Sequence, residues 1–404
     1  MPASYPLLGR YVVPDMPAAE DLLPWLQRID ANRWYSNFGP LVGEFERRLT
    51  AHLAALDKIP DAKPLALTTL ISCYHALQIG LQVLHLPKDA RVLVPAVTFP
   101  ACPLAVRHAG AEPVLADIDP DTWQLTPAIA YCAVANMPVH AVMPVAVYGV
   151  PVSTEEWDRF TEDTGIPVII DAAAALETQA IPRKGLVAHS LHATKPFSVG
   201  EGGLLIARDP ALIEEARCIA NFGTRDRIAV MDGGNAKMSE YHGAVALAQL
   251  ARWEDVKQRR CAIFSRIRTA IEEAGLNVGF QSDIEHAIAG SLMLKTDARP
   301  AEEIISGLSG RGIFAHRMYL PPLYRHPHFA NLAAAKCDGR VLPATAPFAL
   351  KEALMENSEM MMRCVFGLPF HAFLEACDIE CMVDALAEIL QKPKSGRDSR
   401  TATA

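Results

Sequence analysis

The chain has 404 residues, of which 50% are hydrophobic and 21% charged, and its formal net charge is −8. That length accommodates two domains, and the apolar fraction supplies a sizeable core and excludes a largely disordered chain. The negative charge argues against non-specific nucleic-acid binding, which depends on Lys and Arg contacts to phosphates.

The cysteines and the N-terminus give no sign of a secreted protein. Nine cysteines are scattered without the spacing of a disulfide framework. Cys377 and Cys381 have helical i, i+4 spacing, but no second pair or His cluster accompanies them, so we expect buried small side chains and no metal site. The first residues lack the regions of a signal peptide, and prolines interrupt the uncharged stretch 127–154. We expect a soluble, cytoplasmic protein.

Taken in order, the chain begins with two amphipathic helical patterns, at residues 18–32 and 41–56, around a turn-rich loop. From residue 65, short apolar runs alternate with helical stretches. We expect strands at 65–67, 91–94, 113–116, 141–147, 168–170, 190–192 and 203–207. We expect helices between them at 72–83, 102–109 and 153–164. This alternation predicts an α/β fold with a mostly parallel central sheet that helices cover on both faces.

The second half of the chain predicts a smaller unit. A long helical pattern at 238–259 leads out of the large domain, and weaker strand signals at 291–294 follow. Further helices are expected at 260–274, 301–311 and 378–390. We therefore expect a large domain over residues 1–256, a small C-terminal α+β domain over 257–392 and a flexible tail over 393–404.

Lys195 is the first candidate for chemistry, because it lies in a Ser/Thr/Gly-rich turn that follows a strand ending in Asp171. This order suits an enzyme that uses pyridoxal 5'-phosphate (PLP). The lysine would hold the aldehyde as a Schiff base, and the acid would keep the pyridine nitrogen protonated. Alone, Lys195 could be a solvated surface charge and Asp171 a helix cap. The sheet-edge position of Asp171 favours the functional interpretation.

Two more features suit the same cofactor. The helix that begins after Ser72 offers backbone N–H groups and a favourable dipole to a phosphate. Phe99, just beyond a strand, would stack on a flat ring. Ordinary N-capping and core packing are the more common roles for such residues taken singly. The order of all four residues along the chain makes the cofactor interpretation much stronger.

Several motifs in one order resemble a known family. They are 34–46 (WYSNFGPLVGEFE), 94–99 (VPAVTF), 109–120 (AGAEPVLADIDP), 144–149 (PVAVYG), 169–174 (IIDAAA), 192–203 (HATKPFSVGEGG) and 234–240 (GNAKMSE). Over nearly its full length the chain is similar to the DegT/DnrJ/StrS group of nucleotide-sugar aminotransferases, which are fold-type-I PLP enzymes. The resemblance implies that Lys195 is the Schiff-base lysine and proton shuttle, that Asp171 pairs with the ring nitrogen, and that Phe99 stacks on the ring.

The resemblance also implies the remaining contacts. Ser190, Ser72 and the neighbouring Ile71 would lie at the phosphate, and Asn221 would reach the phosphate of a partner subunit. An obligate homodimer with shared sites follows. Three positions are expected near the substrate: Tyr35, Lys237 and Tyr319.

Four residues depart from the family pattern. Leu70-Ile71 replace Gly-Thr, so one hydroxyl of the phosphate site is missing, and Ala146 and Ala174 stand where His and Gln or His are common. These departures leave Lys195 and Asp171 unaffected.

We expect an aminotransferase that moves an amino group from L-glutamate to a keto group of a nucleotide-linked sugar. The alternatives are a PLP-fold sugar dehydratase, an aminotransferase for a non-sugar ketone, and a non-catalytic regulator with this fold. Lys195 speaks against the dehydratase, because dehydratases of this kind carry His instead of the lysine.

Overall fold

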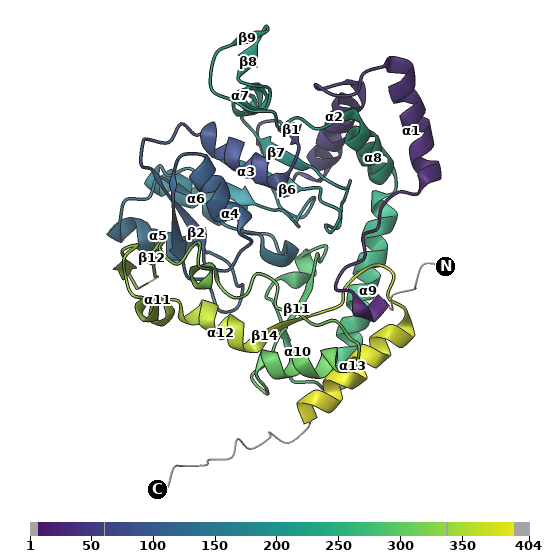
Figure 1. Cartoon of the computed structure of the whole chain (residues 1–404), viewed down its shortest axis with the longest axis vertical. Helices are drawn as coiled ribbons and strands as arrows, with labels where there is room; N and C mark the ends of the chain where they lie inside the picture. Colours follow the sequence, from purple (N-terminus) through teal and green to yellow (C-terminus); the bar gives the residue numbers. More distant parts are fainter. Residues whose placement is uncertain (1–6, 60, 337, 392–404) are drawn as a thin grey trace.

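The computed structural model describes residues 7–59, 61–336 and 338–391. The predicted tail at 393–404 lies outside the described residues, as do residues 1–6 of the N-terminal segment. Figure 1 shows an upper part built around a large sheet and a lower part that contains α10 and α13, with α9 running from one to the other.

A mostly parallel sheet forms the centre of the upper part. Its strands run in the orders β1-β7-β6-β5 and β13-β12-β3-β2-β4, and the parallel bridges Val142–Val168 and Val145–Asp171 join the two halves. Only the pairs β1–β7, β6–β7 and β12–β13 are antiparallel. The strands of this sheet are β1 (Ala66–Leu70), β2 (Arg91–Pro95), β3 (Glu112–Ala116), β4 (Ala141–Val142), β5 (Ile169–Asp171), β6 (Leu186–Ser190), β7 (Gly203–Ala207), β12 (Ala333–Ala335) and β13 (Val341–Leu342).

Helices cover both faces of this sheet, as the sequence predicted. Successive strand residues alternate between two apolar clusters, so that Val92 and Val94 pack on one side and Leu93 on the other. One face is covered by α3 (Cys73–Gln82), α4 (Ala101–His108) and α7 (Pro210–Ala220). The other is covered by α2 (Pro40–Leu56), α5 (Pro127–Asn136), α6 (Thr154–Thr164) and α8 (Glu240–Ala251).

The lower part has its own core. Isoleucines of α9 pack with apolar residues of the strands and helices that follow it. Its principal elements are α9 (Trp253–Glu273), β10 (Gly279–Phe280), β11 (Leu292–Lys295), α10 (Ala301–Ser309), β14 (Val365–Leu368) and α13 (Ala376–Gln391). The other elements of the chain are η1 (Leu7–Gly9), α1 (Ala19–Asn32), η2 (Val147–Gly149), β8 (Thr224–Arg225), β9 (Ile228–Ala229), η3 (Ile284–His286), η4 (Leu323–Arg325), α11 (Phe348–Leu354) and α12 (Glu356–Cys364).

Four local predictions differ from the structure. The strand expected at 141–147 is only two residues long, because β4 ends at Val142 and η2 begins at Val147. The strand expected at 190–192 is displaced, because β6 ends at Ser190 and the Leu191 N–H instead bonds the Gly202 carbonyl across the following loop. The pattern at 238–259 is two helices that meet at Arg252. The uncharged stretch 127–154 contains a helix that was not predicted, α5. Its residues are apolar on all sides, so the sequence shows no helical periodicity there. In the described ranges, no helix is long and apolar enough to cross a membrane.

The division of the chain into domains at residue 256 stays a prediction. That position lies inside α9, and β12, from beyond it, pairs with β3 in the large sheet. The chain after α9 therefore contributes to both parts of the molecule.

Candidate active site

A cavity of about 450 Å³ lies beyond the carboxyl end of β5. Six of the predicted functional residues line it: Ser72, Phe99, Asp171, Ser190, Lys195 and Tyr319. The volume lies within the usual range for sites of small ligands. In a sheet of this kind the crevice beyond the strand ends is the expected ligand site.

Strand register brings the two serines to this cavity. In the sheet, Gly203 of β7 pairs with Ser190 on one side and with Leu70 on the other, two residues before Ser72. A side chain at Gly203 would collide with the backbone of Ser72, 2.3 Å from its carbonyl carbon. The glycine therefore lets β7 pass directly beneath the start of α3, which Ser72 caps by accepting a hydrogen bond from the His75 N–H.

Asp171 is the last residue of β5 and is held firmly. Its backbone N–H bonds the Pro144 carbonyl and its own carbonyl accepts from the Ala146 N–H, both at 2.9 Å. Its side chain is 5% exposed. The carboxylate accepts from the Cys102 thiol at 3.0 Å, from the Ala173 N–H at 3.0 Å and from the Cys73 thiol at 3.9 Å.

The surroundings of Asp171 fit the pyridine nitrogen of PLP. Burial raises the pKa of this carboxyl above its ordinary value, and the neutral hydrogen-bond donors and the charge of Lys195 offset only part of that rise. In the described part of the chain, Asp171 forms no salt bridge, although a buried carboxylate is costly without a cationic partner. A protonated ring nitrogen in the cavity would supply that partner.

Lys195 lies in the loop between β6 and β7. The Ala193 N–H bonds the Gly200 carbonyl, and the Lys195 N–H bonds the His192 carbonyl. The pKa of Lys195 is raised, chiefly by its Coulomb interaction with Tyr319 and further by Asp171, although burial alone would lower it. At neutral pH the Tyr319 phenol is uncharged, so the carboxylate of Asp171 is the group that favours the protonated form of Lys195.

Aromatic side chains form another wall of the cavity. The rings of Tyr148 and Tyr319 stack with centroids 5.3 Å apart and planes 6° from parallel. Phe99 meets Tyr319 edge-on at 6.3 Å, and Tyr11 also lines the cavity. Because burial raises the pKa of both Tyr148 and Tyr319, these phenols stay protonated at neutral pH.

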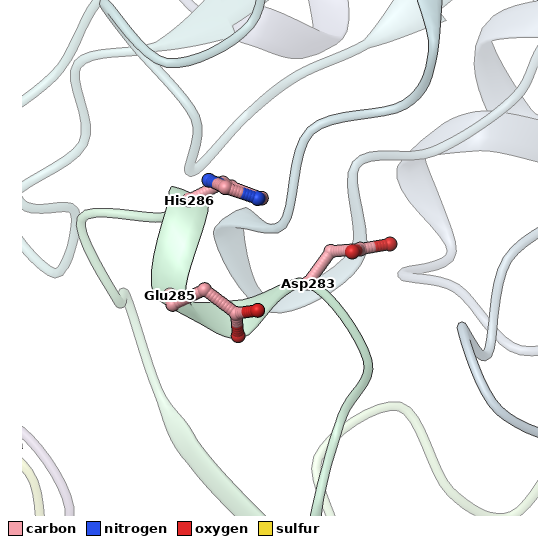
Figure 2. Close-up of side chains that lie close together, drawn as sticks. All are labelled: Asp283, Glu285 and His286. Carbon is pink, nitrogen blue, oxygen red and sulfur yellow. The ribbon is translucent and has the colours of Figure 1, made fainter.

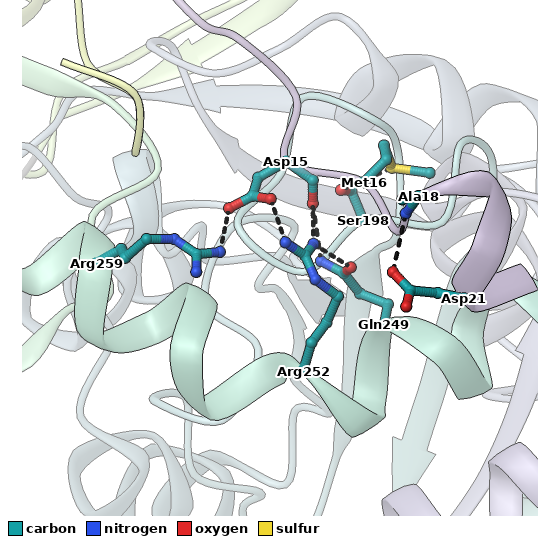
Figure 3. Close-up of polar contacts among 8 residues, drawn as sticks. All are labelled: Asp15, Met16, Ala18, Asp21, Ser198, Gln249, Arg252 and Arg259. Carbon is teal, nitrogen blue, oxygen red and sulfur yellow. Dashed lines mark hydrogen bonds and ion pairs between the residues drawn. The ribbon is translucent and has the colours of Figure 1, made fainter.

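The N-terminal segment that carries Tyr11 is pinned at several points. The Tyr11 carbonyl accepts from the Phe370 N–H at 3.0 Å, and the ring packs on His316. Figure 3 shows the next anchor, where Asp15 pairs with Arg252 at 2.7 Å and with Arg259 at 2.9 Å. The segment therefore bridges the lower part of the molecule and the junction of α8 and α9.

The next residue of this segment reaches the lysine loop. Ser198, three residues after Lys195, donates to the sulfur of Met16 at 3.1 Å (Figure 3). The segment thus touches the loop that carries the candidate catalytic lysine.

Four predicted residues lie apart from these. Among the described residues, the cavity lining does not include Ile71, Tyr35, Lys237 or Asn221. Tyr35 packs near Tyr241, the Lys237 ammonium lies over Phe222, and the Asn221 amide donates to Thr224 at 3.1 Å. Their predicted roles in cofactor or substrate binding remain proposals.

Sequence reasoning missed other residues of the cavity. It did not single out Tyr11 or Tyr148, which line the cavity, or Cys102, which bonds Asp171 from outside the lining. The i, i+4 spacing of Thr98 and Cys102 at the start of a helix was the available signal. Two departures from the family pattern, Ala146 and Ala174, do line the cavity and leave it smaller side chains there.

One exposed group of possible ligands lies elsewhere. Figure 2 shows Asp283, Glu285 and His286 on one turn at η3, with ligand atoms within 4.8 Å of one another. Exposed acidic groups are common, and we assign no metal to them. Cys377 and Cys381 are exposed, so the prediction that they are buried was wrong, because they fall on the outer face of α13.

The sequence matches one family profile over residues 18–386, that of the DegT/DnrJ/EryC1/StrS aminotransferase family. Among curated relatives, Protein Mb3436c of Mycobacterium bovis is 28% identical, over 94% of this chain and 89% of the relative. The dTDP-4-amino-4,6-dideoxy-D-glucose transaminase of Shigella dysenteriae is 26% identical, over 93% of this chain and 97% of the relative.

Solved structures have the same fold. A Bacillus cereus protein assigned as a PLP-dependent aminotransferase superposes with a TM-score of 0.82 at 25% identity, over 93% of this chain and 98% of that chain. The structure of DesI with its TDP-sugar product gives a TM-score of 0.79 at 25% identity, over 95% of this chain and 92% of that chain. These likenesses support the fold-type-I architecture predicted from the sequence.

Proposed function

The chain belongs to the DegT/DnrJ/EryC1/StrS aminotransferase family, and on that premise we propose that it transfers an amino group from L-glutamate to a keto group of a nucleotide-linked sugar. The enzyme is a PLP-dependent aminotransferase. The observation that carries the proposal is the presence in one cavity of Lys195 and of the buried Asp171, which forms no salt bridge with the described residues. The reaction is balanced: glutamate becomes 2-oxoglutarate while the ketone becomes an amine.

The cofactor explains why these residues are needed. Bound PLP supplies an electron-accepting ring that stabilises negative charge at the carbon next to the amino group. In our proposal Lys195 would hold the aldehyde of the cofactor, and Asp171 would pair with its ring nitrogen. Phe99 would cover the ring, and Ser72 and Ser190 would bind the phosphate. The N-terminus of α3, which Ser72 caps, adds favourable N–H dipoles.

Lys195 has a second role in the proposal. Its Nζ atom would accept and return the proton of the substrate carbon, since a group used in this way must lie in the cavity and change protonation readily. The negative charge of Asp171 favours the protonated state of Lys195 and so opposes the basic form.

The acceptor is proposed from the names of relatives of this chain. The names of two relatives, from Shigella dysenteriae and Streptomyces venezuelae, describe transaminases of dTDP-linked amino sugars. Tyr319, which lines the cavity, would contact the sugar. Tyr35 and Lys237, which lie outside the lining of this chain's cavity, would also contact the substrate. Burial lowers the pKa of Lys237, and in the proposal its ammonium group would bind the anionic nucleotide.

A cytoplasmic homodimer completes the proposal. Asn221 lies away from the cavity of its own chain, next to the exposed Phe222 and close to the β8–β9 hairpin that projects from the molecule in Figure 1. These features support a role for Asn221 at the phosphate of a partner subunit. Mixing inactive Lys195→Ala and Asn221→Ala chains should then restore roughly a quarter of the activity, because half of the sites in half of the dimers are intact. Failure of exchanged chains to regain activity would contradict the shared site.

A non-sugar cyclic ketone is the second candidate for the acceptor. The rings of Tyr11, Tyr148, Tyr319 and Phe99 form an apolar wall that suits a planar ring as well as a sugar. A relative from Amycolatopsis mediterranei, 28% identical over 61% of this chain, is named 3-amino-5-hydroxybenzoate synthase.

The test is a panel of acceptors offered with L-glutamate to the PLP-loaded enzyme. We expect continuous formation of 2-oxoglutarate with a nucleotide-linked keto sugar, and none with the free sugar. Turnover with a cyclic ketone but with no nucleotide-linked sugar would favour the second candidate acceptor. No turnover with any ketone would contradict both.

A further inference from the structure

Asp171 rests on two buried thiols, which is an unusual setting for a carboxylate. Cys102 lies 3.0 Å from Oδ2 and Cys73 lies 3.9 Å from Oδ1. The two cysteines come from different helices, since Cys73 begins α3 and Cys102 is in the first turn of α4. Cys102 is 0% exposed and Cys73 is 8% exposed. The carboxylate is therefore held between the first turns of two helices.

The directions of these hydrogen bonds follow from the number of protons. An ionised carboxylate only accepts, so the single proton of the Cys102 thiol is donated to Asp171. Thr98 Oγ1 lies 3.2 Å from the same sulfur. Because the thiol proton is already engaged, the Thr98 hydroxyl donates to the sulfur. A chain of donors thus runs from Thr98 through Cys102 to Asp171, and each bond polarises the next.

The thiols of Cys73 and Cys102 stay protonated at neutral pH. Burial, and then the negative charge of Asp171, raise the pKa of both Cys73 and Cys102 well above the ordinary thiol value of 9.0. They are thus permanent donors and not nucleophiles. A thiol is a weak donor, so the closer Cys102 contributes more than Cys73.

We propose that Cys102 is a positioning residue that keeps Asp171 charged and aimed into the cavity, and thereby keeps the proton on the ring nitrogen of the cofactor. The inference rests on the proposed pairing of Asp171 with that nitrogen. Its physical basis is that a donor to a carboxylate favours the charged form. Without the donor, the proton shared by the two groups shifts from the ring nitrogen toward Asp171. Cys73 supports the same carboxylate from α3.

The experiment follows the ring nitrogen directly, by ¹⁵N NMR of the enzyme loaded with ¹⁵N-labelled PLP. Cys102→Ala removes the donor, Cys102→Ser restores one, and Val106→Ala is the matched control. Val106 lies four residues along α4 and is equally buried, and its side chain has no group that could donate a hydrogen bond to Asp171. We expect the signal of Cys102→Ala to move toward that of unprotonated pyridine, and the signals of Cys102→Ser and Val106→Ala to stay with the wild type.

Cofactor affinity gives a second readout that does not depend on turnover. Loss of one hydrogen bond to a charged group corresponds to about a tenfold increase in the dissociation constant of PLP for Cys102→Ala, with Cys102→Ser close to wild type. An equal weakening by Val106→Ala would show that the effect is only one of packing, and would overturn the proposal. Circular dichroism and thermal melting identify any variant that fails to fold, in which case the serine variant carries the comparison.

Asp171→Asn separates the role of Cys102 from the proposed pairing of Asp171 with the ring nitrogen. If Asp171→Asn moves the ¹⁵N signal and Cys102→Ala does not, the role of Cys102 is refuted while that of Asp171 stands. If Asp171→Asn leaves the signal unchanged, the pairing of Asp171 with the ring nitrogen is itself wrong, and the role of Cys102 falls with it.

Discussion

The wall of the cavity that holds Asp171 belongs to the large sheet and its helices, whereas the wall that holds Tyr11 and Tyr319 is assembled from segments far apart in the chain. Asp171 is fixed by backbone bonds within the sheet and by thiols of α3 and α4. Tyr11 depends on an N-terminal segment that touches the lower part of the molecule at Phe370 and the α8–α9 junction through Asp15. The difference suggests that a rigid wall serves the shared chemistry and an assembled wall serves the choice of acceptor.

The largest expected effect is on the rigid side. Lys195→Ala should lower the rate of glutamate-to-2-oxoglutarate conversion by about 10³- to 10⁴-fold, because both the attachment point and the proton-transferring Nζ atom are lost. Stopped-flow measurement of the half-reaction with PLP-loaded protein checks this. Lys184→Ala is the control, since that lysine is exposed and outside the cavity. A Lys195→Ala enzyme that retained the rate would remove Lys195 from the mechanism.

Asp171→Asn should reduce the same half-reaction by about 10²- to 10³-fold, the usual cost of losing one preorganised electrostatic group. The amide keeps the shape of the side chain but cannot hold the ring nitrogen protonated by its charge. Steady-state and half-reaction rates measured together provide the check. A change in the acceptor KM alone, with the glutamate half-reaction intact, would contradict the division between the two walls.

On the assembled side, Tyr11→Ala should raise the KM for the acceptor about tenfold and leave the glutamate half-reaction within about twofold. The ring lines the cavity but comes from outside the sheet that carries Lys195 and Asp171, and loss of one aromatic contact is worth about 1–2 kcal/mol. Tyr11→Phe keeps the ring and is the matched control. Equal losses in both half-reactions would show that Tyr11 acts on the shared chemistry.

The smallest effect is expected for the anchor of the N-terminal segment. Asp15→Asn should lower the free energy of unfolding by about 1–2 kcal/mol at neutral pH, whereas Asp21→Asn, at an exposed helix cap, should change it by less than about 1 kcal/mol. Figure 3 shows both carboxylates. Thermal or urea unfolding of the two variants measures both changes in the free energy of unfolding.

The pH dependence of this difference follows from the pKa of Asp15. Burial raises that pKa, but the hydrogen bonds and charges of Arg259 and Arg252 outweigh burial and lower it below the ordinary 3.8. The stabilisation is therefore complete above the ordinary value and is lost as the pH falls through the lower folded-state value. A difference between wild type and Asp15→Asn that persisted well below that range would contradict the ion pairs as its source.

The sequence predicted the parts of the molecule whose signals are local. Apolar runs ending in Asp171 and the turn around Lys195 indicated both the sheet and the chemistry, and the register of β7 then brings Ser190 and Ser72 together. The helix α5 escaped prediction because it is apolar on all sides and lacks a periodic pattern.

Contacts between distant segments could not be predicted. Nothing local to Tyr11 indicates that it reaches the cavity, since its position depends on Phe370 and on Asp15 pairing with residues more than 230 positions away. The partnership of Cys102 with Asp171 likewise spans 69 residues. Buried cysteines are usually packing residues, so composition alone favours the wrong interpretation.

The most direct test of the account is the visible absorption spectrum of the purified protein with PLP, before and after L-glutamate, beside Lys195→Ala. We predict a band from cofactor attached at Lys195, absent in Lys195→Ala, which L-glutamate bleaches while an equal amount of 2-oxoglutarate forms. A band that ignores glutamate would contradict the proposed donor. No band in the wild-type protein would contradict the assignment of the cavity to PLP.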